Sequence, residues 1–158
     1  MNLKYFIAFS LCLPMLVEAN SLTIGDTTYP NSCSKAEWVR VKKKLIKYAG
    51  GRSEEQLIKA AYTYLCGHGD VAIKELLLHS PKTILSLSTG SGQDPTKEFV
   101  RAAEAVTPQG GNVWGVEVSM NDALINLTFW PDEACIKSIT FMPKTIGWLI
   151  TQIEESCD

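Results

Sequence analysis

The densest group of chemically reactive residues in this sequence is the run Cys66-Gly67-His68-Gly69-Asp70. A thiol beside an imidazole can form a nucleophile and base pair, and a histidine beside an aspartate can act as a general base. The same residues also fit the end of a helix, with glycines in left-handed backbone, Asp70 as the next cap and Cys66 in a disulfide. Because a disulfide sulfur is not a nucleophile until it is reduced, we expect this cluster to be structural.

Three other groups invite a chemical interpretation. Residues 86–92, Ser-Leu-Ser-Thr-Gly-Ser-Gly, match neither a nucleophile elbow nor a phosphate-binding loop, so we interpret them as a flexible loop. Asp132 and Glu133 could act as paired carboxylates, but adjacent acids after Pro131 are more often turn residues. The sequon Asn126-Leu127-Thr128 lies inside a predicted strand, and we assign it no role. The sequence therefore predicts no catalytic residue and no cofactor.

Cysteines give a clearer signal. A zinc site would need close pairs of cysteine or histidine, yet no two of the four cysteines after the leader lie within four residues of each other. With His79 as the only histidine besides His68, a metal site has little support. In an exported chain, four cysteines indicate two disulfides, with three possible pairings. The four are Cys33, Cys66, Cys135 and Cys157.

Residues 1–19 have the pattern of a cleaved secretory signal peptide. Lys4 gives a positive start, an apolar run of about 13 residues follows, and Val17-Glu18-Ala19 places small residues where a signal peptidase cleaves. The run is too short for a membrane span, which needs about 20 residues. We therefore expect a mature chain that begins near Asn20 and lies in the periplasm or is secreted, without stable membrane insertion.

The part of the mature chain at 34–107 has helical signals. Capping boxes begin at Ser34 and Ser53, Asp70 can cap a third helix, and Ser80-Pro81 and Asp94-Pro95 each look like a cap followed by proline. Apolar residues recur at helical spacing behind each of these signals. The pattern predicts about five helices after a polar, extended arm at 20–32.

The hydrophobic period changes from 3.6 to 2 near residue 108. Strands are predicted at 113–118, 123–130, 136–142 and 148–154, and the connectors between them are short. The sequence therefore predicts one α+β domain at 20–158, with a helical half packed on a four-stranded antiparallel meander at 112–155.

This order of elements selects one pairing of the cysteines. If the first two helices form an antiparallel hairpin around Gly50-Gly51, Cys33 lies beside Cys66. Cys135 and Cys157 are equally distant from Ile146 in the last predicted hairpin, so they face each other across its open end. We predict the disulfides Cys33–Cys66 and Cys135–Cys157.

Charge is divided unequally along the chain, although the net charge is only −2. Residues 35–59 carry eight basic and three acidic side chains, whereas residues 113–158 carry two basic and seven acidic ones. The small net charge argues against nucleic-acid binding. An acidic sheet surface would attract a basic partner protein, although solvated faces also carry charge. The residues that we predict for this surface are Glu117, Asp122, Trp130, Asp132, Glu133 and Glu154.

In its plan, the chain resembles the small exported immunity proteins that neutralise toxins in bacteria, which are often single domains of this size with a signal peptide and few disulfides. This resemblance implies a non-catalytic inhibitor of a secreted toxin or enzyme, and it assigns no site residues. Two alternatives stay open. One is a small exported hydrolase that uses His68 with Asp70 or the loop serines. The other is a ligand-binding domain, because residues 147–153 look like the last strand of cystatin-like or NTF2-like domains.

Overall fold

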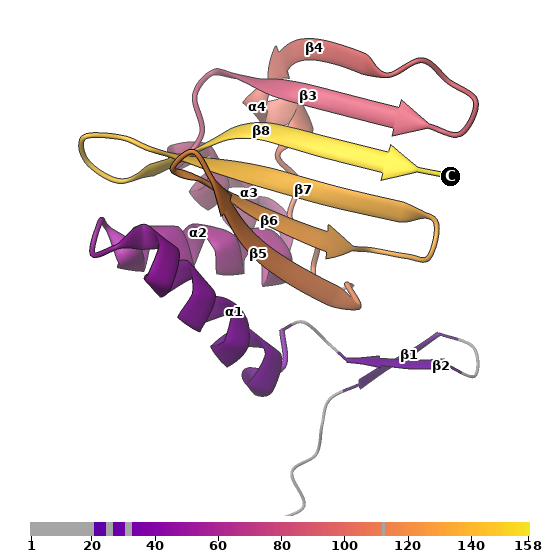
Figure 1. Ribbon diagram of the computed structural model, residues 1–158, viewed down its shortest axis with the longest axis horizontal. Coiled ribbons are helices and arrows are strands. Elements are labelled where there is room, and N and C mark those ends of the chain that lie inside the picture. Colours follow the sequence, from indigo (N-terminus) through magenta and orange to yellow (C-terminus); the bar gives the residue numbers. More distant parts are fainter. Residues whose placement is uncertain (1–20, 25–26, 31–32, 112) are drawn as a thin grey trace, which may run out of the picture.

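The structure is a computed structural model that describes residues 21–24, 27–30, 33–111 and 113–158 (Figure 1). The predicted signal peptide at 1–19 lies outside the described residues. Within the predicted arm, β1 (Ser21–Ile24) and β2 (Thr27–Pro30) pair as an antiparallel two-stranded sheet.

The first helix, α1 (Lys35–Ala49), begins and ends as its sequence predicts. The Ser34 hydroxyl accepts a hydrogen bond from the Glu37 amide at 3.4 Å, which satisfies one of the free amides at the start of a helix. Gly50 ends the helix in left-handed backbone, with φ at 60°. The Glu37 carboxylate does not complete the capping box, because it forms an ion pair with Arg40.

Two further helices follow, α2 (Glu54–Cys66) and α3 (Gly69–Leu78). Ser53 precedes α2 but its side chain makes no capping bond, and the Glu54 carboxylate instead accepts the Gly51 amide at 3.0 Å. The cap position of α3 is His68, so the prediction that Asp70 caps this helix was wrong. Asp70 lies in the first turn, where a negative charge is still favourable.

The fourth and fifth predicted helices were wrong. The chain forms β3 (Thr83–Gly90) and β4 (Thr96–Arg101) there, and only the single turn α4 (Ala102–Ala105) is helical. The Ser80 hydroxyl donates to the Leu76 carbonyl at 3.0 Å, so Ser80 closes α3 instead of opening a new helix. Leucines alternate with serines through residues 85–88, which is the period of a strand. The interpretation of residues 86–92 as a flexible loop was therefore also wrong for residues 86–90, which belong to β3.

The last four strands lie where the sequence predicts them and pair in succession. They are β5 (Gly115–Asn121), β6 (Leu124–Trp130), β7 (Cys135–Pro143) and β8 (Trp148–Cys157).

The predicted four-stranded antiparallel sheet was nevertheless wrong, because these strands belong to a larger, mixed sheet. Its order is β4-β3-β8-β7-β6-β5, and β3 runs parallel to β8 while the other neighbours are antiparallel. The described residues thus form an α+β fold with four helices and a six-stranded sheet, and residues 83–90 and 96–101 are strands within the range predicted to be helical.

The helices α1, α2 and α3 lie on one face of the sheet (Figure 1). Between the two layers, Leu45, Tyr64 and Leu76 pack with sheet residues such as Phe129 and Phe141, all of them almost fully buried. The ring of Tyr64 meets that of Phe129 edge to face at 5.7 Å between centroids. None of the described helices covers the other face of the sheet, and we call it the outer face.

Both predicted disulfides are confirmed. Cys33, just before α1, is bonded to Cys66 at the end of α2, with 5.8 Å between their Cα atoms. Cys135 and Cys157 are direct partners in the β7–β8 register, with 4.2 Å between their Cα atoms. Each disulfide joins the two ends of an antiparallel hairpin, which is the geometry that the order of elements requires.

Candidate protein-binding face of the sheet

The outer face carries an ordered row of side chains that crosses every strand of the six-stranded sheet. Directly paired residues of neighbouring strands point to the same face, so the register identifies the members of a row. Glu117 and Glu154 are in the same row, and they are separated by the two strands β6 and β7. From β5 to β4 the row reads Glu117, Thr128, Ser138, Glu154, Leu87 and Lys97.

A small hollow lies on this row. It has a volume of about 210 Å³ and is lined by Thr128, Ile136, Ser138, Glu154 and Ser156. One carboxylate, three hydroxyls and one aliphatic side chain suit a single cationic side chain of a partner protein, with its stem against Ile136 and its charge near Glu154. Within the described part of the chain, Glu154 forms no ion pair, so its charge is available.

Trp130 lies at the end of the outer face next to this hollow. It is paired with Gly115, where an added Cβ would lie 3.3 Å from the Trp130 ring. A side chain at residue 115 would therefore crowd the Trp130 ring. Trp130 is half-buried, so part of the ring faces solvent. Partly exposed tryptophan is the side chain type most often found at the energetic centre of protein interfaces.

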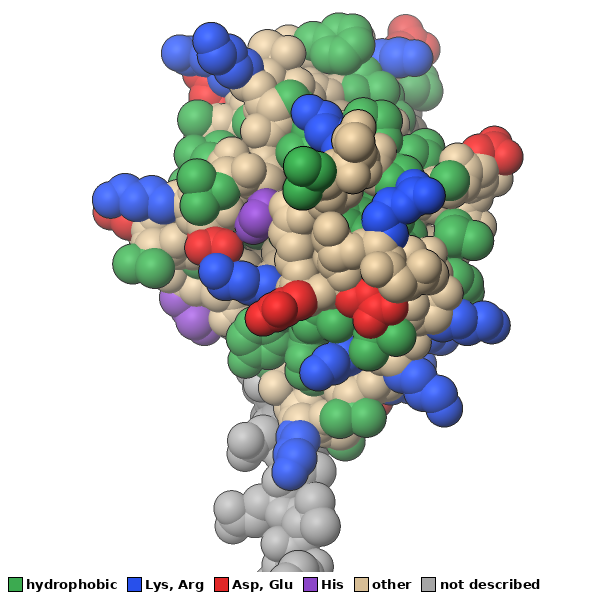
Figure 2. Space-filling model, turned by 90° about the vertical axis from the view of Figure 1, so that its left-hand side faces the viewer, with side chains coloured by type: hydrophobic (Ala, Val, Ile, Leu, Met, Phe, Trp, Pro, Cys, Tyr) green, Lys and Arg blue, Asp and Glu red, His purple; other side chains and the backbone are tan. Residues whose placement is uncertain are grey.

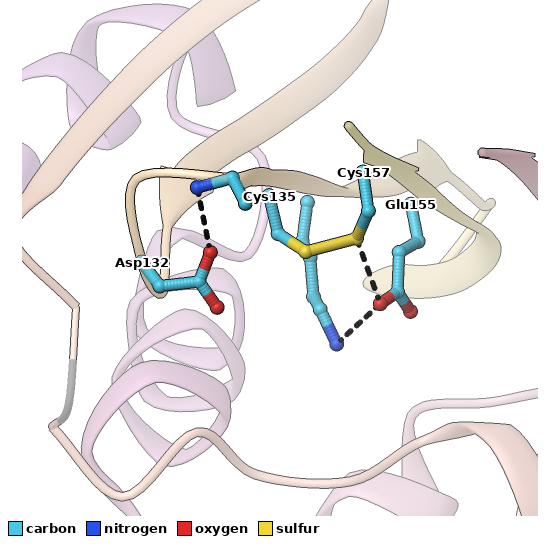
Figure 3. The surroundings of a disulfide bond; sticks show 6 residues. Asp132, Cys135, Glu155 and Cys157 are labelled. Atoms are coloured by element: carbon cyan, nitrogen blue, oxygen red, sulfur yellow. Dashed lines mark hydrogen bonds and ion pairs between the residues drawn. A yellow bond between two sulfur atoms is a disulfide. The ribbon is translucent and has the colours of Figure 1, made fainter. Parts of the chain in front are cut away.

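The other predicted acidic residues do not join this row. Asp122 lies in the β5–β6 turn with φ at 48°, and Asp132 and Glu133 lie in the β6–β7 turn, at the opposite end of β6. A seven-residue strand separates these turns by roughly 20 Å. The Asp132 carboxylate accepts the Ala134 amide at 2.9 Å, which is a turn-forming role (Figure 3). The structure therefore divides the predicted surface into a central row and two separate turns.

The disulfide between β7 and β8 lies on the helix-facing side of the sheet (Figure 3). Lys137 and Glu155 form an ion pair of 3.1 Å beside it, and Glu155 approaches the Cys157 sulfur at 3.4 Å. The atoms of Cys135, Glu155 and Cys157 are close enough to surround a metal ion. Disulfide sulfurs are not thiolates, however, so this group is not a ligand set while the bond is formed.

The Cys66–Asp70 cluster has a structural arrangement. Cys66 is buried in its disulfide, and a Cβ on Gly67 would clash with the Thr63 carbonyl and lie 2.7 Å from the Ala72 side chain. His68 and Asp70 are exposed, and among the described residues no hydrogen bond joins them. The structure gives no support to a nucleophile and base pair at this position.

A polar cluster that the sequence analysis missed joins α2, α3 and β8. Gln56 bonds to Nδ1 of His79 at 2.8 Å, and Nε2 of His79 lies 3.3 Å from the Glu75 carboxylate. The Gln56 side chain also accepts the Trp148 amide at 3.3 Å and donates to the Trp148 carbonyl at 3.4 Å. The spacing of Glu75 and His79, four residues apart on one helix, is the sequence signal that could have revealed part of it.

This cluster lines a hollow of about 430 Å³, but the polar side chains of His79 and Glu75 already bond to other side chains of the cluster. Both ring nitrogens of His79 have partners, so neither is free to activate a nucleophile. Lys59 forms an ion pair of 2.7 Å with Glu75 and holds the pKa of that carboxyl below its ordinary value. We therefore interpret the cluster as a latch between two helices and the sheet.

The basic residues of α1 lie on the other layer of the molecule. Arg40 pairs with Glu37 and also donates to the Val116 carbonyl of β5 at 3.3 Å. Viewed from the side that is at the left of Figure 1, acidic, basic and hydrophobic side chains are interspersed (Figure 2). No large field of one sign appears on that side.

None of the helices in the described part of the chain has the length and hydrophobicity of a membrane-spanning segment. Comparison with protein-family models gives no match, and comparison with curated proteins gives none either. Among solved structures, a crystal structure of a DUF4783 family protein from Bacteroides ovatus is similar at 15% identity and a TM-score of 0.34. The similarity covers 55% of this chain and 84% of that chain, and at this level it carries no argument about fold or function.

Proposed function

We propose that this chain is a non-catalytic binding protein that works outside the cytoplasm and inhibits a partner protein, with the outer face of the sheet as its binding surface. The observation that carries the proposal is the uncovered outer face, with the row from Glu117 to Glu154 and the hollow beside Glu154. The proposed partner is a secreted toxin or enzyme, as for the exported immunity proteins that the chain resembles in plan.

Electrostatics supports this choice of face. Of the seven acidic side chains in residues 113–158, Glu117 and Glu154 project from the outer face in the part formed by β5 to β8. A surface of this kind increases the association rate with a basic partner more than it slows dissociation. Location outside the cytoplasm is supported by the two disulfides, which persist in oxidising compartments.

Neither alternative has comparable support. A hydrolase would need a base with a free nitrogen near a nucleophile, whereas both nitrogens of His79 are occupied and His68 is an exposed cap residue. A ligand-binding domain would need space between the helices and the sheet. Tyr64 and Phe129 pack against each other in that position.

The test begins with a photo-crosslinking amino acid at Thr128, which captures the partner in the native host for identification. The purified partner is then measured by surface plasmon resonance against the double variant Glu117→Gln and Glu154→Gln. We expect slower association and a flatter salt dependence, with a smaller change in dissociation. Trp130→Ala should increase the dissociation rate, at a loss of about 2 kcal/mol.

Matched controls lie on the helical layer. Glu55→Gln with Asp70→Asn removes two exposed acidic charges there, and Tyr62→Ala removes an exposed aromatic ring. Both should leave the kinetics at wild-type values. If neutralising Lys43, Lys44 and Lys47 on α1 abolishes binding while the Glu117 and Glu154 variant keeps wild-type kinetics, the proposed surface is wrong.

A further inference from the structure

The strand β4 is an edge of the sheet that is exposed on both faces. It is the last strand in the order, and among the residues that the structure describes only β3 pairs with it. Five of its six residues are exposed, and Phe99 retains 77% of its accessible surface. An edge strand presents a row of backbone donors and acceptors that can pair with another extended chain.

The opposite edge of the sheet differs. There α1 lies against β5 (Figure 1). The Arg40 side chain donates to the Val116 carbonyl at 3.3 Å. One acceptor of that edge is thus engaged by a side chain from the helical layer. Strand β4 contains no proline, and among the described residues no side chain bonds to its backbone, which pairs with β3 alone. The two edges of this sheet are therefore not equivalent.

From these observations we infer that β4 binds an extended segment of the partner as an added antiparallel strand. The inference rests on the proposed function, since it specifies how the partner is held. Antiparallel addition continues the antiparallel pairing of β3 with β4 and gives the more stable hydrogen-bond geometry.

The outward side chains of β4 define what the segment must carry. Lys97, Phe99 and Arg101 alternate along the strand and point to the outer face, where Phe99 is paired with Leu85. Lys97 forms no ion pair in the described part of the chain, whereas Arg101 is already paired with Glu104. In antiparallel addition, the residue opposite Lys97 follows the one opposite Phe99 by two positions. The matching segment therefore has an apolar residue, any residue, and then an acidic residue.

The same charges disfavour a second copy of this chain as the occupant. In a symmetric antiparallel pair centred on Phe99, Lys97 of one copy would lie opposite Arg101 of the other. Like charges directly opposite each other destabilise a strand pair. Charged residues at an edge are also a common protection against self-association.

Synthetic heptapeptides test the inference on the folded protein with both disulfides formed. The probe is acetyl-Thr-Val-Thr-Leu-Thr-Glu-Thr-amide, and binding is followed by chemical shifts of the backbone amides. We expect shifts centred on residues 96–101. A peptide with lysine in place of glutamate should bind about two- to fivefold more weakly, the size expected for an exposed ion pair. Lys97→Glu should reverse this preference, and N-methylation of alternate peptide nitrogens should abolish binding.

Four outcomes would overturn the inference. They are unchanged amides at 96–101, equal binding of the N-methylated peptide, tighter binding of a peptide with leucine and glutamate exchanged, and a dimer in sedimentation that Phe99→Asp dissociates. Unchanged amides would exclude the β4 edge as the binding site, and equal binding of the N-methylated peptide would exclude strand addition. Tighter binding of the exchanged peptide would indicate parallel addition, and the dimer would identify a second copy as the occupant. The kinetic test of Glu117 and Glu154 does not involve β4, so the proposed function and this inference can fail separately.

Discussion

At the scale of single residues, the side chain that joins the most elements is Gln56. Gln56 lies on α2 and its side chain bonds to His79, the residue that ends α3. It also bonds to the backbone N–H and C=O of Trp148, as a neighbouring strand would at the start of β8. A Cβ on Gly147 would clash with the Gln56 amide, so the glycine before Trp148 is what lets the side chain reach the strand. Trp148 itself is buried and donates from its indole nitrogen to the Arg52 carbonyl at 2.6 Å.

We expect Gln56→Ala to lower the free energy of unfolding by about 1–3 kcal/mol, because it leaves half-buried polar groups of His79 and Trp148 without partners. The matched control is Glu55→Ala, an exposed neighbour on the same helix, which should change stability by less than about 0.5 kcal/mol. Urea unfolding at pH 7 measures both. Equal stability of the two variants would mean that the latch contributes nothing.

At the scale of elements, two hairpins are each joined at their open ends by a disulfide. The Cys33–Cys66 bond closes a chain segment with a sequence separation of 33 around α1 and α2, and Cys135–Cys157 closes one of 22 around β7 and β8. The first lies partly within the core, where Cys66 is 9% exposed, whereas both cysteines of the second are half-buried. Removing the first therefore removes core packing as well as the crosslink.

We predict that replacing Cys135 and Cys157 by alanine lowers the free energy of unfolding by about 3–4 kcal/mol, the loop-closure value for segments of this length. Replacing Cys33 and Cys66 should destabilise the protein by more, since it also removes a buried sulfur from the core. Urea unfolding of each double variant, with the wild type as reference, gives both values. The reverse order of stabilities would contradict the packing argument.

At the scale of the whole molecule, the protein consists of two layers of different charge. Residues 35–59, which include all of α1 and the start of α2, carry eight basic side chains, while residues 113–158 of the sheet carry seven acidic ones. In the described part of the chain the helices cover one face of the sheet, so the row with Glu117 and Glu154 on the outer face and the β4 edge stay accessible to a partner. The two disulfides are consistent with an oxidising compartment.

We expect export with cleavage near Ala19, so that protein from the native host begins near Asn20. Cleavage also removes Cys12, and the mature protein should then have no free thiol when it is denatured without reductant. Mass spectrometry and thiol titration check both points. The control is Ala19→Glu, which removes the small residue at the cleavage site and should retain the leader. A mature chain that still begins at Met1 would refute the prediction.

The sequence alone predicted those parts of the fold that depend on neighbouring residues. Capping by Ser34, the end of α1 at Gly50 and the four strands from β5 to β8 follow from local backbone preferences and from short hydrophobic periods. The disulfide pairing followed as well, because each bond joins the ends of one hairpin. Local sequence likewise placed Glu117 and Glu154 on predicted strands.

Only the tertiary structure decided that β3 and β4 are strands and where they lie in the sheet. Strand β4 has no alternating pattern of its own and is extended because its backbone pairs with β3, while β3 lies beside β8 from the far end of the chain. Such pairing depends on contacts between distant segments, which local propensity does not encode. Because of the pairing of β3 with β4 and β8, two segments predicted to be helical are strands. The same pairing places Glu154 and Lys97 in one row and makes β4 the edge strand. The candidate binding surfaces therefore follow from the order of the strands in the sheet.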